Sequence, residues 1–87
     1  MKKINEDDIE MKYLINCSPT LIHKNHKYTL VNVHRHNHGK YEYMSVMIPV
    51  YVVIDKYGFI APGDTEDVMN YLKEREDLIW MLAAENS

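Results

Sequence analysis

Two stretches of alternating side chains around a short central turn constrain the fold of this chain more than any other feature. Residues 27–36 and 41–48 are rich in β-branched and aromatic side chains, which predicts two strands. His38-Gly39 between them is typical of a two-residue hairpin turn, and such a turn also fixes the pairing register. One face then pairs Arg35 with Glu42, Val33 with Met44, Val31 with Val46 and Thr29 with Ile48, and the other pairs His36 with Tyr41, His34 with Tyr43, Asn32 with Ser45 and Leu30 with Met47.

The two faces of this predicted hairpin differ in their chemistry. The face of Val31 and Val33 is apolar with an ion pair at its tip, whereas the face of His34 and His36 is polar and aromatic. A slip of one residue would bury the histidines, so only the apolar face suits a core. We therefore predict an α+β fold, a small single domain over residues 1–87. An N-terminal and a C-terminal helix pack on one face of an antiparallel sheet of three to five strands.

The flanking segments supply the remaining predicted elements. Asn5 is a favourable N-cap followed by acidic residues, which predicts a first helix over residues 6–15. Apolar residues at helical spacing predict a second helix that starts at Asp64 or Thr65 and runs to about residue 84. The segments between these elements predict short strands over residues 20–24, 50–54 and 59–61 and a turn over residues 55–58.

Length and composition limit what this domain can be. Eighty-seven residues bury a modest core, so an isolated domain is marginally stable and homo-oligomerisation stays open. No stretch has the apolar length of a membrane span or of a leader peptide, and the single cysteine, Cys17, fits a reducing compartment. We expect a cytoplasmic protein with no membrane partner. The frequent Lys, Asn, Ile, Tyr and Met indicate an AT-rich genome and, with the small size, a phage or mobile-element protein.

Charge is segregated along the chain. The net charge is −3, yet residues 18–41 contain no aspartate or glutamate and include all five histidines. Lysine and arginine contact phosphates, and tyrosine and histidine rings on a sheet face can stack with unpaired bases. We therefore predict a small non-enzymatic RNA-binding regulatory protein that uses a basic, His- and Tyr-rich hairpin. Its predicted RNA-binding residues are Lys24, Lys27, His34, Arg35, His36, His38, Lys40, Tyr41 and Tyr43.

The acidic C-terminal helix supports an alternative of a different class. An acidic helix face can dock on a basic protein, and small phage-like proteins that take over a host often act by inhibition. The alternative is therefore a protein-interaction inhibitor that neutralises a host nuclease, toxin or defence factor. Its predicted contact residues are Glu66, Asp67, Glu74, Glu76, Asp77 and Trp80.

Catalysis needs more than the residue types that this chain supplies. A pair of histidines and a lysine can cleave RNA by acid and base catalysis, and His34 and His36 with Lys27 or Lys40 match that description. No pocket-forming feature accompanies them. Cys17 follows a predicted helix, where a lone cysteine is typically a small buried apolar residue. We expect no catalytic residue, no metal site and no cofactor.

One resemblance to a known family involves the same histidines. His36, His38 and Glu42 have the H-x-H-x-x-x-E spacing of the first metal-binding motif of cupins, and Pro62-Gly63-Asp64 resembles a turn found later in those proteins. The resemblance covers residues 30–64 and implies a β-barrel with a bound metal. It does not extend to the second motif, because no histidine follows His38. A small His-ligated metalloprotein is the third hypothesis.

Overall fold

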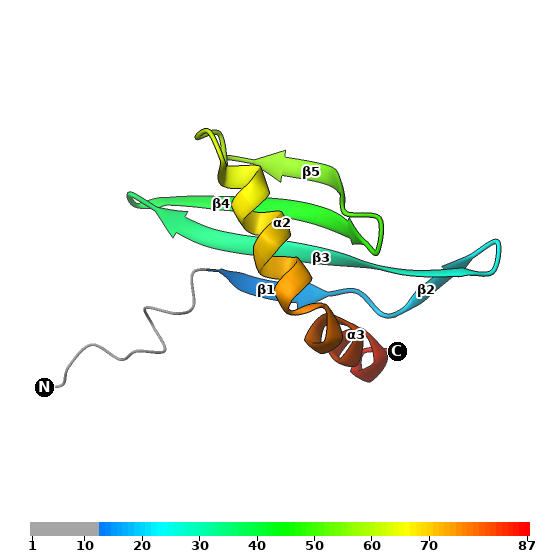
Figure 1. Ribbon diagram of the computed structural model, residues 1–87. Coiled ribbons are helices and arrows are strands. Elements are labelled where there is room, and N and C mark those ends of the chain that lie inside the picture. The colour runs from blue at the N-terminus through cyan, green and yellow to red at the C-terminus, as the bar shows by residue number, and fades with distance from the viewer. Residues whose placement is uncertain (1–12) are drawn as a thin grey trace, which may run out of the picture.

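A long central strand organises the fold. The structure, a computed structural model, describes residues 13–87 (Figure 1). In the described part the strand order is β1-β3-β4-β5, all antiparallel, and β2 pairs with the first part of β3. The strands are β1 (Leu14–Cys17), β2 (Leu21–His23), β3 (His26–Asn37), β4 (Lys40–Ile48) and β5 (Val52–Tyr57), and the helices are α2 (Asp64–Glu74) and α3 (Glu76–Glu85).

The predicted register of β3 and β4 is confirmed. All the pairs expected on both faces are present, including Arg35 with Glu42. The expected turn is also present, because His38 and Gly39 both have left-handed φ angles, of 52° and 80°, as in the two-residue turns that match strand twist. Glycine adopts such an angle without strain, so this turn sets which face each side chain of the hairpin occupies.

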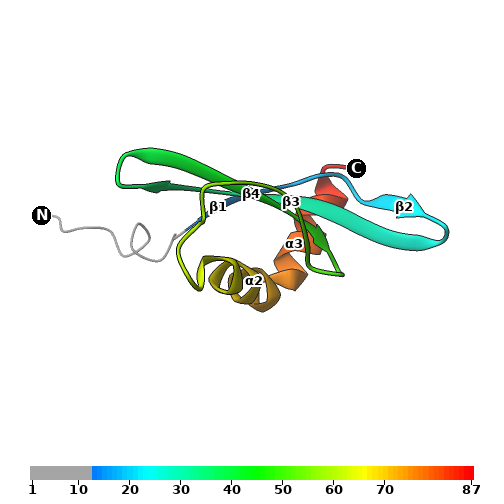
Figure 2. The same ribbon diagram turned by 90° about the horizontal axis from the view of Figure 1, so that it is seen from above.

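The two helices cover the apolar face of the sheet, as we predicted for the C-terminal part of the chain (Figure 2). Cys17 is buried beside this core, as expected for a lone cysteine. Removing these apolar side chains from water is the main force that holds sheet and helices together. The fully buried core side chains are Val31, Val33, Met44, Val46 and Ile48 from the sheet and Val68, Leu72, Ile79 and Ala83 from the helices.

The first predicted helix is not shown. Residues 6–12 of that prediction lie outside the described part of the chain, and its last two residues, Leu14 and Ile15, belong to strand β1. That ending of the helix was wrong. Side chains of β1 alternate between exposed and partly or fully buried positions, so the strand adds a half-buried edge to β3 with Leu14 opposite His34. Pairing with β3 gives the backbone groups of this segment hydrogen-bond partners.

Strand β5 is longer than predicted. We expected a strand over residues 50–54 and a turn over residues 55–58, but β5 starts at Val52 and continues through Tyr57, with a bulge where its pairing passes from Ser45 to Val46. The expected short strand over residues 59–61 does not form. Gly58 and Phe59 both have positive φ angles, which turn the chain towards the helices and bury the Phe59 ring.

The second predicted helix is divided in two. Arg75, with φ −119°, separates α2 from α3, so one long helix was wrong. Gly63, with φ 86°, occupies the N-cap position that we assigned to Asp64 or Thr65. Acidic side chains occupy the first turn of each helix, where they stabilise the positive end of the helix dipole. Figure 1 shows that α2 crosses the strands of the sheet and that α3 continues from its end beside β1.

Candidate nucleic-acid interface

The sheet has an open face on the side away from the helices. Alternation along the strands directs His34 and His36 of β3 to this side. Their cross-strand partners on β4, Tyr43 and Tyr41, lie on the same side. Figure 2 shows α2 and α3 on the opposite side. Among residues 13–87, no element covers this face, which we call the open face.

Aromatic rings on the open face form cross-strand groups, which we call the aromatic platform: His34, His36, Tyr41, Tyr43 and Tyr57. The His34 and Tyr41 rings lie 5.5 Å apart at 24°, and the Tyr43 and Tyr57 rings lie 6.0 Å apart at 18°. The His36 ring meets the Tyr41 ring edge-on, with centroids 5.7 Å apart. Tyr57 is 63% exposed and Tyr41 is 48% exposed. Large aromatic surfaces therefore remain available to solvent.

Hydrogen bonds orient three of these rings, those of His34, Tyr41 and Tyr43. The Tyr41 hydroxyl is hydrogen-bonded to Nδ1 of His34, and Asn16 of β1 lies 3.4 Å from Nε2 of the same histidine. The Tyr43 hydroxyl donates to a carboxylate oxygen of Asp55 at 3.1 Å, and this bond raises the pKa of Tyr43. The platform is consequently preorganised and does not need to be ordered by a ligand.

The basic residues of the predicted hairpin do not form one cluster. Lys40 and His38 lie at the β3–β4 tip, whereas Lys24 and Lys27 lie at the β2–β3 hairpin. The two hairpin ends are at opposite ends of β3, a strand of 12 residues and on the order of 40 Å (Figure 1). Charge that is continuous in the sequence is therefore divided in space between two separate sites.

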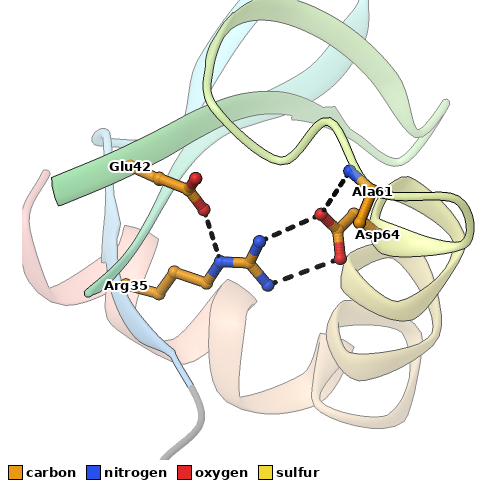
Figure 3. Close-up of polar contacts among 4 residues, drawn as sticks. All are labelled: Arg35, Glu42, Ala61 and Asp64. Atoms are coloured by element: carbon orange, nitrogen blue, oxygen red, sulfur yellow. Dashed lines mark hydrogen bonds and ion pairs between the residues drawn. The ribbon is translucent and has the colours of Figure 1, made fainter. Parts of the chain in front are cut away.

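Arg35 points to the other side of the sheet from the histidines. Its guanidinium donates from Nε to Glu42 at 2.7 Å and from Nη2 to Asp64 at 2.9 Å (Figure 3). It also lies 4.2 Å from the centroid of the Phe59 ring, and only 17% of the side chain is exposed. The guanidinium of Arg35 is ion-paired with two carboxylates on the core side of the sheet, so its position does not suit the phosphate contact that the sequence suggested.

Electrostatics around Arg35 are those of a tight ion-pair network. Hydrogen bonds from Arg35 lower the pKa of both the Glu42 and the Asp64 carboxyl groups, against the opposing effect of burial. The Ala61 amide adds a further hydrogen bond to Asp64 at 3.0 Å (Figure 3). This network joins the β3–β4 tip to the start of α2. Its role is to position the strands that carry the aromatic platform.

The acidic residues that we assigned to protein binding are divided between two helices. Glu66, Asp67 and Glu74 are exposed on α2, and Asp77 is exposed on α3. Glu76, in contrast, accepts hydrogen bonds from the Tyr51 hydroxyl at 2.6 Å and from the indole of Trp80 at 3.1 Å. Burial and this carboxylate raise the pKa of Tyr51. Glu76 and Trp80 thus have structural partners.

The cupin-like motif does not assemble in this fold. Glu42 lies on the helix side of the sheet and His36 lies on the open face, so the two expected ligands point in opposite directions. The described sheet has two free edges, so it is not closed into a barrel. Within residues 13–87 there is no group of three His, Cys, Asp or Glu side chains placed to hold a metal ion.

Sequence reasoning missed Tyr57 and two hollows in the surface. The prediction of a turn at residues 55–58 concealed Tyr57, and the bulge in β5 leaves no regular alternation that could have indicated a longer strand. One hollow, of about 580 Å³, lies at the β3–β4 tip and is lined by residues that include Lys40, Tyr41 and Tyr57. The other, of about 510 Å³, lies by the β2–β3 hairpin. Lys40 lines the first hollow, and Lys24 and Lys27 line the second.

Comparisons of this chain with protein-family models, with curated proteins and with solved structures found no significant match. In the described part of the chain, neither helix has the length and apolarity needed to cross a lipid bilayer. The chemistry of the open face is therefore the basis for a functional proposal.

Proposed function

We propose that this protein binds single-stranded RNA on the open face of its sheet, as a non-enzymatic regulatory protein of phage or mobile-element type. The observation that carries the proposal is the aromatic platform: exposed rings held in cross-strand groups on an uncovered sheet. Unpaired bases stack on such rings, and each stacking contact contributes roughly 1–3 kcal/mol of binding free energy. An antiparallel sheet that presents aromatic rings is a recurrent way to recognise single-stranded RNA.

A lysine at the edge of the platform can contact a polyanion. Lys40 lines the hollow at the tip together with Tyr41, Tyr57 and Glu42, and its ammonium group can reach a phosphate there. Asp55 is the acidic residue of this face among the described strands, and it accepts a hydrogen bond from Tyr43. The platform is therefore aromatic with Lys40 as its nearby cation, and the carboxylates of Asp55 and Glu42 lie close to it.

A single strand suits this surface better than a duplex. The bases of a duplex are paired and stacked on one another, so they offer no ring surface to a flat protein face. Reading the major groove of DNA requires an inserted helix or ribbon, and both described helices lie on the far side of the sheet with acidic first turns. The proposal therefore predicts that duplexes compete only weakly with single-stranded RNA for the open face.

A second candidate function is inhibition of a basic host protein such as a nuclease or toxin. Its support is the set of exposed carboxylates on α2 and α3, including Glu66, Asp67 and Asp77. The two helices that carry these carboxylates lie on the side of the sheet opposite the open face (Figure 2). Substitutions on the two sides can therefore separate the two functions.

Fluorescence anisotropy with a labelled oligouridylate of about twelve nucleotides tests the RNA proposal. Tyr57→Ala and Tyr41→Ala should each weaken binding by roughly 1–3 kcal/mol, because a stacking surface is lost. Met81→Ala is the matched control, because Met81 is similarly exposed, at 59%, but lies on α3. Unchanged binding by both tyrosine variants would contradict the proposal.

Salt dependence tests the contribution of Lys40. Lys40→Ala should reduce the slope of log affinity against log salt by roughly 0.7, the value for one phosphate contact on a single strand. Lys73→Ala, an exposed lysine on α2, should leave the slope unchanged.

Weaker binding by Glu66→Lys and Asp67→Lys to a basic protein partner, together with no RNA binding by the wild type, would favour the second candidate.

A further inference from the structure

A second hollow on the surface, which we call the hairpin groove, combines an apolar floor with a basic rim. Its volume is about 510 Å³. It lies between the β2–β3 hairpin and the turn that follows β4. The floor is formed by Tyr28, Met47, Pro49 and Val50, and the rim by His23, Lys24, His26 and Lys27.

The lining of the hairpin groove indicates an anionic ligand with a flat apolar part. All four ionisable side chains of its rim are basic in type, and no carboxylate lines it. The ring of Tyr28 and the side chain of Pro49 supply a surface for stacking, as aromatic residues do in single-strand sites. A nucleotide has both features, because its base is flat and its phosphate is negatively charged.

The hairpin groove and the aromatic platform belong to the same side of the sheet. Tyr28 follows the same alternation along β3 as His34 and His36, and Met47 follows that of Tyr43 along β4. Leu30 pairs with Met47 between the two sites, and both side chains are partly exposed. A ligand can therefore pass from one site to the other without leaving the open face.

From these observations we infer that the hairpin groove is a second nucleotide-binding subsite for the same single-stranded RNA. This inference rests on the proposed function. Tyr28 and His36 are eight positions apart in β3, a span of roughly 25 Å at about 3.3 Å per residue. Stacked nucleotides rise about 3.4 Å each, so a strand that contacts both sites must contain several nucleotides. The protein consequently selects single strands by length.

Two RNA lengths and a set of point variants test the inference. Oligouridylates of about three and about twelve nucleotides are titrated into the protein, and affinity is taken from backbone amide chemical shifts. Tyr28→Ala should weaken binding of the longer RNA by roughly 5- to 150-fold, whereas Tyr28→Phe, which keeps the ring, should not. The double variant Lys24→Ala, Lys27→Ala should reduce the salt slope for the longer RNA by roughly 1.4. Ile22→Ala, an exposed hairpin residue outside the groove lining, is the control.

The short RNA separates the two proposals. It occupies only the aromatic platform in our account, so the groove variants should bind it like the wild type. If Tyr57→Ala weakens binding of the longer RNA and Tyr28→Ala does not, the second subsite is overturned and the proposed function stays intact. An equal loss of affinity for the short and the longer RNA in Tyr28→Ala would also overturn the second subsite. Wild-type affinity in both Tyr57→Ala and Tyr28→Ala would overturn the proposed function and this inference together.

Discussion

Arg35 and Asp64, 29 positions apart in the sequence, are joined by a hydrogen bond of 2.9 Å between Nη2 and Oδ2. The same guanidinium donates to Glu42, its cross-strand partner, at 2.7 Å (Figure 3). The β3–β4 tip is thereby attached to the first turn of α2. Because His34, His36 and Tyr41 lie on the reverse side of the same strands, an ion pair on the core side holds the aromatic platform in place.

Removing Arg35 should destabilise the fold. In Arg35→Met two carboxylates would remain near the core without their cation, at a cost of about 1–3 kcal/mol. Urea unfolding measures this as a lower midpoint with an unchanged slope. Lys24→Met in the β2–β3 turn is the control, because Lys24 is exposed and this variant should unfold like the wild type. Equal midpoints for both variants would show that the network adds no stability.

The same network should make stability depend on acidity. The pKa values of Glu42 and Asp64 are lower in the folded state than in ordinary peptides, because Arg35 stabilises the charged carboxylates. The folded state therefore binds protons less readily than the unfolded state. Its contribution to stability should be complete above the ordinary carboxyl values of about 3.9 to 4.3 and should be lost as pH falls below them.

Urea midpoints measured between about pH 2 and pH 7 test this dependence. The wild type should lose stability as the medium becomes acidic, and Arg35→Met should lose less, because its carboxyl groups lack the cation that lowers their pKa. Parallel curves for the two proteins would show that other groups control the acid response.

Two glycines should differ in their tolerance of a side chain. Gly58 and Gly39 both have left-handed φ angles, of 90° and 80°, so alanine at either position is strained by roughly 1–2 kcal/mol. At Gly58 the added carbon would also collide with the Glu42 side chain, whereas at Gly39 it meets open space. Gly58→Ala should therefore lower the thermal unfolding midpoint more than Gly39→Ala. The reverse order would contradict the packing of Glu42 against this turn.

The sequence could predict the central hairpin because its information is local. Alternation on both strands and a glycine at position 39 allow one register only, and the structure has that register. The buried face followed from the same alternation, and the C-terminal helical segment that covers it followed from apolar residues at helical spacing. The break at Arg75 was not visible, because an arginine carries no helix-breaking signal and the break depends on how the two helices fit the sheet.

The candidate site was only partly predictable. The sequence places His34, His36, Tyr41 and Tyr43 together, since they pair directly across two strands. It could not show that Lys24 and Lys40 lie at opposite ends of the sheet, because a run of charge in the sequence says nothing about the path of the chain. Nor could it show that Asp64 would engage Arg35, since that contact depends on where α2 begins.

The central claim is that RNA binds on the open face, and backbone amide chemical shifts of the wild type test it most directly. Titration with an oligouridylate of about twelve nucleotides should shift amides of β3, β4 and β5, with the largest changes near His34, Tyr41 and Tyr57. Amides of α2 and α3 should remain unperturbed. Shifts confined to the helices, or none in the sheet at saturating RNA, would contradict the claim.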